Sequence, residues 1–383
     1  MFQAALVAPL WTSCGFGSPE AERASRRALE LCERTAPDTA AHFRALYGLA
    51  YAYLIRGDLR RARPLAEQML DLAERLQDLE LLAYAHFEMG CELLWSAELV
   101  AARAHLEQGI ALYDPEWGRP ASSRFAFNCA SNCHSFLTRI CWHLGYPEEA
   151  LRHSGQAIAI GEDISHPFSQ AVARGWTAAL RQLRGETRRT QELAEILLAF
   201  ATEQVFPFFA AHALVFRGWA LVEHGQSEEG IAQLREGLVA YRATGAELES
   251  SHWLGLLAEA CRDTGQTEEG LRAIAEAFEH VARTGIVYCE PELRRLEGEL
   301  RLRQDPADAE KAEACFRRAV EIARRQQAKS WELRAAMSLA RLWRDQGKPQ
   351  QARELLAPVY GWFTEGFDTR DLKEAKALLE ELA

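Results

Sequence analysis

The stretch HALVFRGWALVEHGQSEEGIAQLREGLVAYRATGAE, residues 212–247, decides the fold of this chain. Apolar side chains recur along it at spacings of three, four and seven residues, as the buried face of an amphipathic helix requires. Gly225 predicts the end of one helix and Ser227 predicts the N-cap of the next, whose first turn holds Glu228 and Glu229. The stretch therefore predicts two antiparallel helices joined by a tight turn.

This turn recurs along the chain at a nearly fixed interval. Gly145, Gly185, Gly225 and Gly265 follow one another 40 residues apart. With an eight-residue insertion before Gly145 and two extra residues before Gly347, the same interval adds four turn positions: Gly57, Ala97, Asp305 and Gly347. Self-similarity at such a period is the signature of a repeat array, in which each helix pair buries its core against its neighbours.

A small residue follows each turn by five positions, where a larger side chain would hold two antiparallel helices apart. These residues are Ala62, Ala102, Ala150, Thr190, Gly230, Gly270 and Ala352, with Ala312 displaced by two positions. With the turn residues they match the tetratricopeptide (TPR) motif, in a unit longer than the usual one of about 34 residues. We therefore predict an all-α fold, a right-handed α-solenoid of about eight TPR-like helix pairs. It spans 1–383 as one superhelical domain, with a half-repeat in 1–36 and a polar capping helix in 364–383.

Composition and charge narrow the classes of partner and compartment. Hydrophobic residues make up 48% of the chain, enough for a large core, and the net charge of −11 repels phosphate backbones, so we expect no nucleic-acid partner. No run of 18 apolar residues predicts a membrane span. The nine cysteines are scattered and odd in number, which predicts reduced thiols in a cytoplasmic protein. The apolar stretch 1–11 lacks a preceding basic residue, so we expect a first helix there and not a signal peptide.

Four segments carry a family likeness: residues 5–22, 218–247, 330–348 and 355–382. They resemble the C-terminal repeat region of large bacterial signalling proteins, in which this array follows an AAA-type ATPase and an adenylate-cyclase-like or transcriptional-regulator domain. The resemblance covers nearly the whole chain and implies a sensor or scaffold role. The chemistry of that family lies in its other domains, and this chain has neither a G-x-x-x-x-G-K-[ST] phosphate loop nor paired cyclase aspartates.

The first helix of each pair lines the concave surface of such an array. The residue that follows the small position of each first helix is expected to face this surface, a rule that we call the motif phase. It selects eight residues: Tyr51, Cys91, Arg139, Ala179, Trp219, Glu259, Glu299 and Arg341. Aromatic and arginine side chains are frequent anchors in peptide and small-molecule grooves. The groove candidates are therefore Tyr47, Tyr51, Phe87, Trp95, Asn128, Asn132, Ser135, Arg139, Trp142 and Trp219. Core packing remains the alternative for each aromatic residue, because aromatic side chains at helical spacing are common in cores.

Thiols and histidines gather in NCASNCHSFLTRICWH, residues 128–143. Cys129 and Cys133 share a helix face near His134 and Cys141, which is compatible with buried thiols or with a soft-metal or redox site. Buried thiols are favoured because the short C-x2-C knuckle and a second ligand pair are missing. We predict no catalytic residue, no metal and no cofactor, because the sequence has no Gly-x-Ser-x-Gly elbow, H-E-x-x-H helix or Rossmann glycine set.

These observations predict a non-catalytic interaction or sensory module of bacterial signal transduction. Its concave groove is expected to bind a peptide, a partner domain or a small molecule. One alternative is an enzyme or small-molecule-processing protein with its site between Asn128 and Trp142. Another is a homodimer that self-associates through the exposed end of its last repeats.

Overall fold

The computed structural model describes residues 17, 19–118, 125 and 127–383. Within them the chain forms 18 α-helices and two short 3₁₀ helices, without a β-strand. The α-helices are α2 (Pro19–Thr35), α3 (Ala40–Ile55), α4 (Leu59–Leu76), α5 (Leu79–Trp95), α6 (Leu99–Leu112), α7 (Cys129–His143), α8 (Pro147–Asp163), α9 (Pro167–Leu183), α10 (Thr187–Glu203), α11 (Pro207–Glu223), α12 (Ser227–Ala243), α13 (Ser250–Asp263), α14 (Thr267–Thr284), α15 (Glu290–Gln304), α16 (Ala309–Arg325), α17 (Lys329–Asp345), α18 (Pro349–Tyr360) and α19 (Arg370–Glu381). The helix expected in 1–11 lies outside the described residues.

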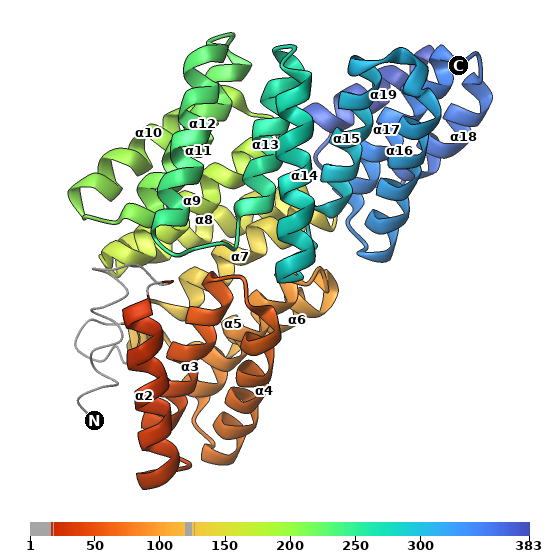
Figure 1. Ribbon diagram of the computed structural model, residues 1–383. Coiled ribbons are helices and arrows are strands. Elements are labelled where there is room, and N and C mark those ends of the chain that lie inside the picture. Colours follow the sequence, from red (N-terminus) through yellow and green to blue (C-terminus); the bar gives the residue numbers. More distant parts are fainter. Residues whose placement is uncertain (1–16, 18, 119–124, 126) are drawn as a thin grey trace.

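Consecutive helices pack in antiparallel pairs, which form two layers. The odd-numbered helices from α3 to α19 each contact the next odd-numbered helix and form the inner layer. The even-numbered helices pack mainly against their neighbours in the sequence and form the outer layer. Figure 1 shows the resulting array as it rises from α2 to α14 and then turns aside into α15–α19. The all-α TPR-like solenoid predicted from the repeat is confirmed.

Seven of the eight predicted turn positions have the left-handed backbone that ends a helix. They are Gly57, Ala97, Gly145, Gly185, Gly225, Gly265 and Gly347, with φ between 63° and 89°. Asp305 differs, because its φ is −148° and a 3₁₀ helix, Pro306–Asp308, makes this turn. The N-cap predicted at Ser227 is wrong by one residue: α12 begins at Ser227, and Gln226 occupies the cap without a side-chain hydrogen bond.

The predicted small residues lie where the helices of a pair come closest. All eight are buried, and the tightest approach is that of α11 and α12. A Cβ atom added at Gly230 would lie 2.6 Å from the carbonyl oxygen of Gly218, and one added at Gly218 would lie 2.7 Å from that of Gly230. The helix backbones therefore touch at this point.

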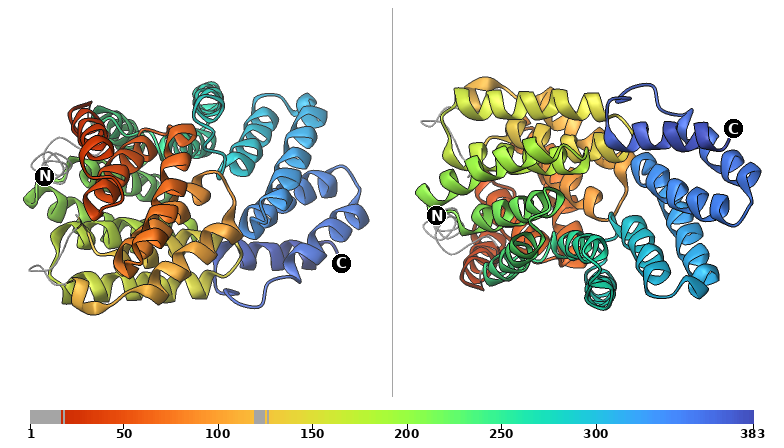
Figure 2. Two further views of the ribbon diagram at one scale, coloured as in Figure 1. Left: turned by 90° about the horizontal axis from the view of Figure 1, so that it is seen from below. Right: turned by 90° about the horizontal axis from the view of Figure 1, so that it is seen from above.

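The superhelix closes on itself, so that its second turn rests on its first. The backbone N–H of Glu247 donates to Ile55 O at 2.9 Å, and that of Val287 donates to Trp95 O at 3.0 Å. The Ser330 hydroxyl likewise donates to the carbonyl of Trp142. These three contacts join the ends of α3, α5 and α7 to segments 188 to 192 residues later, or five helix pairs further along. Figure 2 shows the C-terminal segment, in dark blue, against the yellow helices of the middle of the chain.

Apolar side chains form a long core between the layers. The largest cluster of buried apolar side chains runs from Ala21 to Trp331, and a second runs from Ala312 to Leu382. The predicted terminal helix in 364–383 is present as α19, which buries Leu372, Ala375 and Leu378. Among the helices that the structure describes, none combines the length and apolar character needed to span a bilayer.

We predict opposite effects for two glycine-to-alanine substitutions. Gly230→Ala lowers the free energy of unfolding by about 2 kcal/mol or more, because its methyl group meets the backbone of α11. Gly155→Ala raises it by about 0.5–1 kcal/mol, because this exposed helical position has no atom within 4 Å of the added Cβ. Urea unfolding followed by far-ultraviolet circular dichroism measures both. Equal effects of the two substitutions would contradict the close packing of α11 and α12.

Candidate functional site

The ten groove candidates named from the sequence all lie inside the protein. None exposes more than 6% of its surface. Six of them lie on α3, α5 and α11, or at the end of α7, where they pack among apolar side chains: Tyr47, Tyr51, Phe87, Trp95, Trp142 and Trp219. The inner face of these helices is therefore mostly core in this conformation, and a ligand role for the ten residues stays a prediction.

The insertion predicted before Gly145 places two aromatic side chains against the start of the concave face. It forms the connection between α6 and α7, and its Phe127 packs at 5.4 Å from Phe87 and 5.8 Å from Tyr51, measured between ring centroids. The ring of Phe125 stacks on that of Tyr84, with 3.7 Å between the ring centroids. Phe125 and Phe127 thus fill the space in which a groove between α3 and α5 would lie.

The polar candidates on α7 serve the local structure. Asn128 is the N-cap of this helix: its Oδ1 accepts from the Ser131 N–H at 2.9 Å, and its Nδ2 donates to the Tyr113 hydroxyl at 2.6 Å. The Ser135 hydroxyl donates to the carbonyl of Ser131 at 2.8 Å. Asn132 is different, because both polar atoms of its side chain are buried without a hydrogen-bond partner.

Arg139 forms a buried ion pair between the two turns of the superhelix. Its Nη1 lies 2.9 Å from Glu249 Oε2 and donates to the Tyr288 hydroxyl at 3.2 Å. The guanidinium carbon also lies 4.6 Å from the ring centroid of Trp176 and 5.4 Å from that of Trp95, within the range of cation–π attraction. Burial raises the pKa of Glu249, but the charge and hydrogen bond of Arg139, together with the nearby His212 and His252, outweigh burial, and the net shift of this pKa is downward. Both groups are therefore charged at neutral pH.

A small cavity of about 40 Å³ adjoins this ion pair. Trp95, Arg139, Glu249 and His212 line it together with aromatic side chains from α9, α11 and α12. The Trp95 Nε1 and Arg139 Nε atoms are buried without a hydrogen-bond partner. An apolar pocket with a few unsatisfied polar groups is the usual setting of a small-molecule site.

A larger and open cleft lies further along the inner layer, between α11, α13, α15, α17 and α19. Its volume is about 720 Å³. Six arginines and seven carboxylates line it: Arg262, Arg295, Arg303, Arg334, Arg341 and Arg370, and Glu223, Glu259, Asp263, Glu299, Asp345, Asp371 and Glu374. We call this region the charged cleft.

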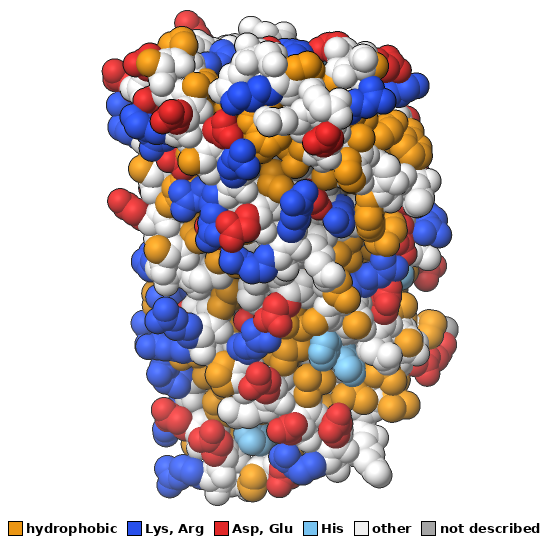
Figure 3. Space-filling model, turned by 90° about the vertical axis from the view of Figure 1, so that its right-hand side faces the viewer, with side chains coloured by type: hydrophobic (Ala, Val, Ile, Leu, Met, Phe, Trp, Pro, Cys, Tyr) orange, Lys and Arg blue, Asp and Glu red, His pale blue; other side chains and the backbone are white. Residues whose placement is uncertain are grey.

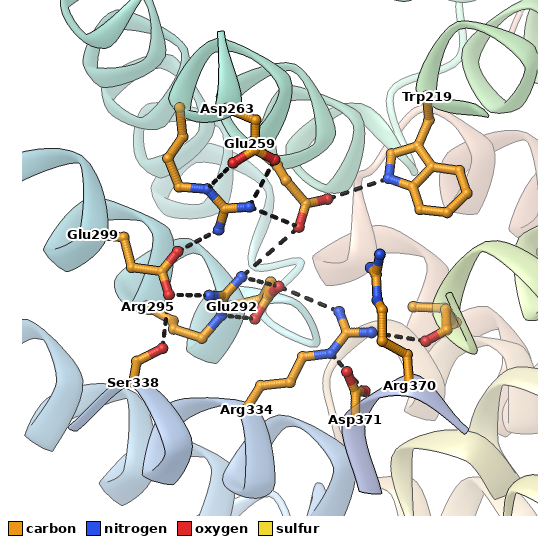
Figure 4. A network of polar contacts seen from close by, with 12 residues as sticks. Trp219, Glu259, Asp263, Glu292, Arg295, Glu299, Arg334, Ser338, Arg370 and Asp371 are labelled. Atoms are coloured by element: carbon orange, nitrogen blue, oxygen red, sulfur yellow. Dashed lines mark hydrogen bonds and ion pairs between the residues drawn. The ribbon is translucent and has the colours of Figure 1, made fainter. Parts of the chain in front are cut away.

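The floor of the charged cleft is a continuous network of ion pairs (Figure 4). Arg295 holds both oxygens of Glu292, at 2.7 and 2.8 Å, and contacts Glu299 at 2.5 Å. Arg334 pairs with Asp371 at 2.8 Å and donates to the carbonyl of Leu183 at 2.7 Å, which ties the floor to the first turn of the superhelix. Glu292 has a lowered pKa, because Arg295 and Arg334 outweigh the effect of burial. These side chains are fixed, and each opposite charge is satisfied.

The rim of the charged cleft is more exposed and less constrained. The side chains of Arg303 and Arg341 expose 51% and 39% of their surface. Arg341 pairs with Glu374 at 2.8 Å, and Arg303 donates to the carbonyl of Arg262 at 2.8 Å. Exposed pairs of this kind contribute little to stability, so a ligand can replace them at small cost.

Some residues of this cleft were predicted from the sequence by the motif phase. Glu259, Glu299 and Arg341 are three of the eight residues that the phase placed on the concave surface, and all three line the cleft. Trp219, a fourth, donates from Nε1 to Glu259 at 3.3 Å beside it. The signal missed in the sequence was the recurrence of arginine on the inner helices near these positions, at Arg262, Arg295, Arg334 and Arg370.

The thiol and histidine cluster of 128–143 does not form one group. Cys129 and Cys133 are both buried, with their sulfur atoms 3.9 Å apart. His134 faces away from this pair toward His153 on α8, with 2.8 Å between the two Nδ1 atoms. Cys141 lies with Glu149 and His153 instead. The soft-metal or redox alternative is thus not assembled from the four residues that the sequence suggested.

Charges on the outer surface are mixed. Figure 3 shows Lys and Arg side chains interspersed with Asp and Glu side chains on the face that it presents. On the outer helices many charged side chains form ion pairs, such as Arg235 with Glu269 and Arg242 with Glu276 between α12 and α14. A nucleic-acid surface would instead gather basic side chains on one face.

Comparisons with known proteins agree with this architecture. The family model described as tetratricopeptide repeat matches residues 44–68, 132–156 and 333–358. A Rap protein complexed with Competence and Sporulation Factor has a TM-score of 0.65 at 12% identity, over 100% of this chain and 98% of that chain. Aspartyl phosphate phosphatase F from Bacillus subtilis has a TM-score of 0.49 at 12% identity, over 93% of this chain and 92% of that chain. The third structure is a signal transduction ATPase with numerous domains and a tetratricopeptide repeat sensor, from Pyrococcus horikoshii. Its TM-score is 0.42 at 16% identity, over 95% of this chain and 55% of that chain.

No curated protein matches the sequence. The family model shows TPR repeats in the chain, and the likeness to the Rap protein, at its low identity, shows the fold alone.

We predict that the Arg139–Glu249 pair is costly to break from one side. Arg139→Met lowers the free energy of unfolding by about 3–5 kcal/mol, because it leaves Glu249 charged, buried and unpaired. Adding Glu249→Gln to Arg139→Met restores a large part of this loss, because the buried charge is gone. Thermal and urea unfolding of the single and double variants measure both effects. Additive losses in the double variant would show that the two side chains do not interact.

Proposed function

We propose that this chain is a non-catalytic TPR scaffold that binds a peptide or an extended segment of a partner protein in the charged cleft. The observation that carries the proposal is the openness of the inner face at α11–α19, where a cleft of about 720 Å³ remains between helices that are otherwise packed. The inner face of α3–α7, in contrast, is occupied by Phe125, Phe127 and the second turn of the superhelix.

The charge pattern of the cleft favours a ligand that carries both signs of charge. Arginine and carboxylate side chains line it in nearly equal number, so a strongly anionic or cationic chain would meet repulsion along part of its length. Arginine recognises carboxylates through two parallel hydrogen bonds. A peptide with acidic and basic side chains can therefore exchange partners with the rim pairs while the floor stays intact.

The fixed floor supports binding by preorganisation. Glu292, Arg295 and Glu299 hold one another across two helical turns of α15, and Ser338 of α17 donates to Glu299 at 2.8 Å. Side chains that are ordered before binding lose little conformational entropy when the ligand arrives. Only the long rim side chains, such as Arg303 and Arg341, have to be ordered by the ligand.

The cavity beside Arg139 supports a second candidate, a small-molecule sensor. Its aromatic walls and the unsatisfied Trp95 Nε1 and Arg139 Nε atoms are features of a ligand pocket. Its volume of about 40 Å³ holds little more than a water molecule, so binding requires the two turns of the superhelix to separate slightly. A native mass spectrum of the purified chain beside its denatured mass tests this candidate.

The alternatives from the sequence have less support. An enzyme site between Asn128 and Trp142 would need several free polar groups, whereas Asn128 caps a helix and Arg139 is paired with Glu249. Asn132 is the groove candidate there whose side-chain polar atoms both lack a partner. A homodimer through the last repeats would need an open apolar end, and α19 covers it.

The eight described cysteines are free thiols, which supports a reducing cytoplasm. The resemblance of the sequence to bacterial signalling proteins supports a sensory role within such a system.

We predict that charge reversal at the rim weakens peptide binding without unfolding the protein. Peptides selected on the wild-type chain from a random library should bind the double variant Arg303→Glu/Arg341→Glu at least about tenfold more weakly, a change of about 1.4 kcal/mol. Fluorescence anisotropy with a labelled peptide measures this affinity. The control is Arg188→Glu on the outer helix α10, whose side chain is 88% exposed. Unchanged affinity in the double variant, or an equal loss in the control, would contradict the assignment of the cleft.

A further inference from the structure

Three potential metal ligands converge between α7 and α8, outside the charged cleft. The sulfur of Cys141, a carboxylate oxygen of Glu149 and a ring nitrogen of His153 all lie within 4.8 Å of one another. Cys141 comes from the last turn of α7, and Glu149 and His153 are one helical turn apart on the same face of α8. The tight turn at Gly145 brings the two helices together at this point.

The surroundings of these three groups suit a bound cation. The Cys141 side chain is fully buried, and its sulfur faces the carboxylate and the imidazole. His153 is held in place by a second histidine, because its Nδ1 lies 2.8 Å from Nδ1 of His134. A ring held by a hydrogen bond at one nitrogen while the other binds a metal is the common arrangement of histidine ligands.

The donor set selects the class of metal. Thiolate, imidazole and carboxylate together are typical of zinc and similar thiophilic divalent ions, whereas magnesium and calcium prefer oxygen ligands alone. The bond lengths of a tetrahedral zinc site place neighbouring ligand atoms about 3.5 Å apart, so small side-chain rotations suffice to close the site from 4.8 Å. Three protein ligands leave one position for water.

We propose that Cys141, Glu149 and His153 form a binding site for a divalent transition metal of the zinc class. When the metal binds, a bond forms between the metal and the Cys141 sulfur, and the thiol proton passes to solvent. Arg103 now lies 2.7 Å from Glu149 and also pairs with Glu107 at 2.7 Å. The metal displaces Arg103 from one Glu149 oxygen, and Glu107 keeps the guanidinium paired.

Cobalt substitution tests this site in the full chain. The protein is stripped with a chelator and titrated with Co²⁺ without oxygen, and absorption is recorded. We expect one Co²⁺ per chain, a sulfur-to-cobalt charge-transfer band and the intense d–d bands of four-coordinate cobalt, all removed by one equivalent of Zn²⁺. Cys141→Ser should abolish the charge-transfer band, and His153→Gln should weaken binding by at least about tenfold.

The control variant is Cys133→Ser, because Cys133 is a buried thiol of α7 that pairs with Cys129 and lies outside the proposed site. It should keep the full spectrum. Zn²⁺ should also raise the melting temperature of the wild type and of Cys133→Ser but not of Glu149→Gln, a half-buried position at which the substitution keeps the side-chain shape. The absence of a charge-transfer band in the wild type, or its loss in Cys133→Ser with retention in Cys141→Ser, would overturn the proposal.

Discussion

Contact between the two turns of the superhelix is the constraint on which the rest of this structure depends. The backbone carbonyls that end α3 and α5 accept hydrogen bonds from segments five helix pairs later, and Arg139 joins Glu249 across the same boundary. This contact turns the inner face of the first repeats into core. The inner face of the last repeats instead lines the open charged cleft.

Much of the fold could be predicted from local sequence, because a TPR-like pair is defined by residues close together in the chain. Glycine at the turn and a small residue five positions later have steric causes that any such pair shares. The second series of turns, between pairs, was missed because residues such as Gln77, Ser165 and Val205 occupy the left-handed region there in place of glycine. The N–H of each donates to the carbonyl three residues earlier, at the end of a helix, in a conformation that the residue's own preference does not indicate.

The candidate site was harder to predict for a related reason. The motif phase assigns a residue to the inner face, and it did so correctly for Glu259, Glu299 and Arg341. It carries no information about what lies opposite that face. The aromatic residues Tyr47 and Phe87 lie on inner helices too, yet both pack against Phe127 of the connection before α7. Whether an inner residue belongs to a core or a cleft depends on what packs opposite it, such as Phe127 for Tyr47 and Phe87. For Arg139 it is Glu249, from the second turn of the superhelix.

The stacking of the two turns also fixes the number of repeats. In an open solenoid, gene duplication can add or remove a helix pair anywhere, because each pair meets only its neighbours. Here the loss of one pair between α3 and α13 would shift the carbonyl of Ile55 away from Glu247 and the guanidinium of Arg139 away from Glu249. Such an array can accept changes in side chains and connections, such as the insertion that carries Phe127, more readily than a change in the number of its repeats.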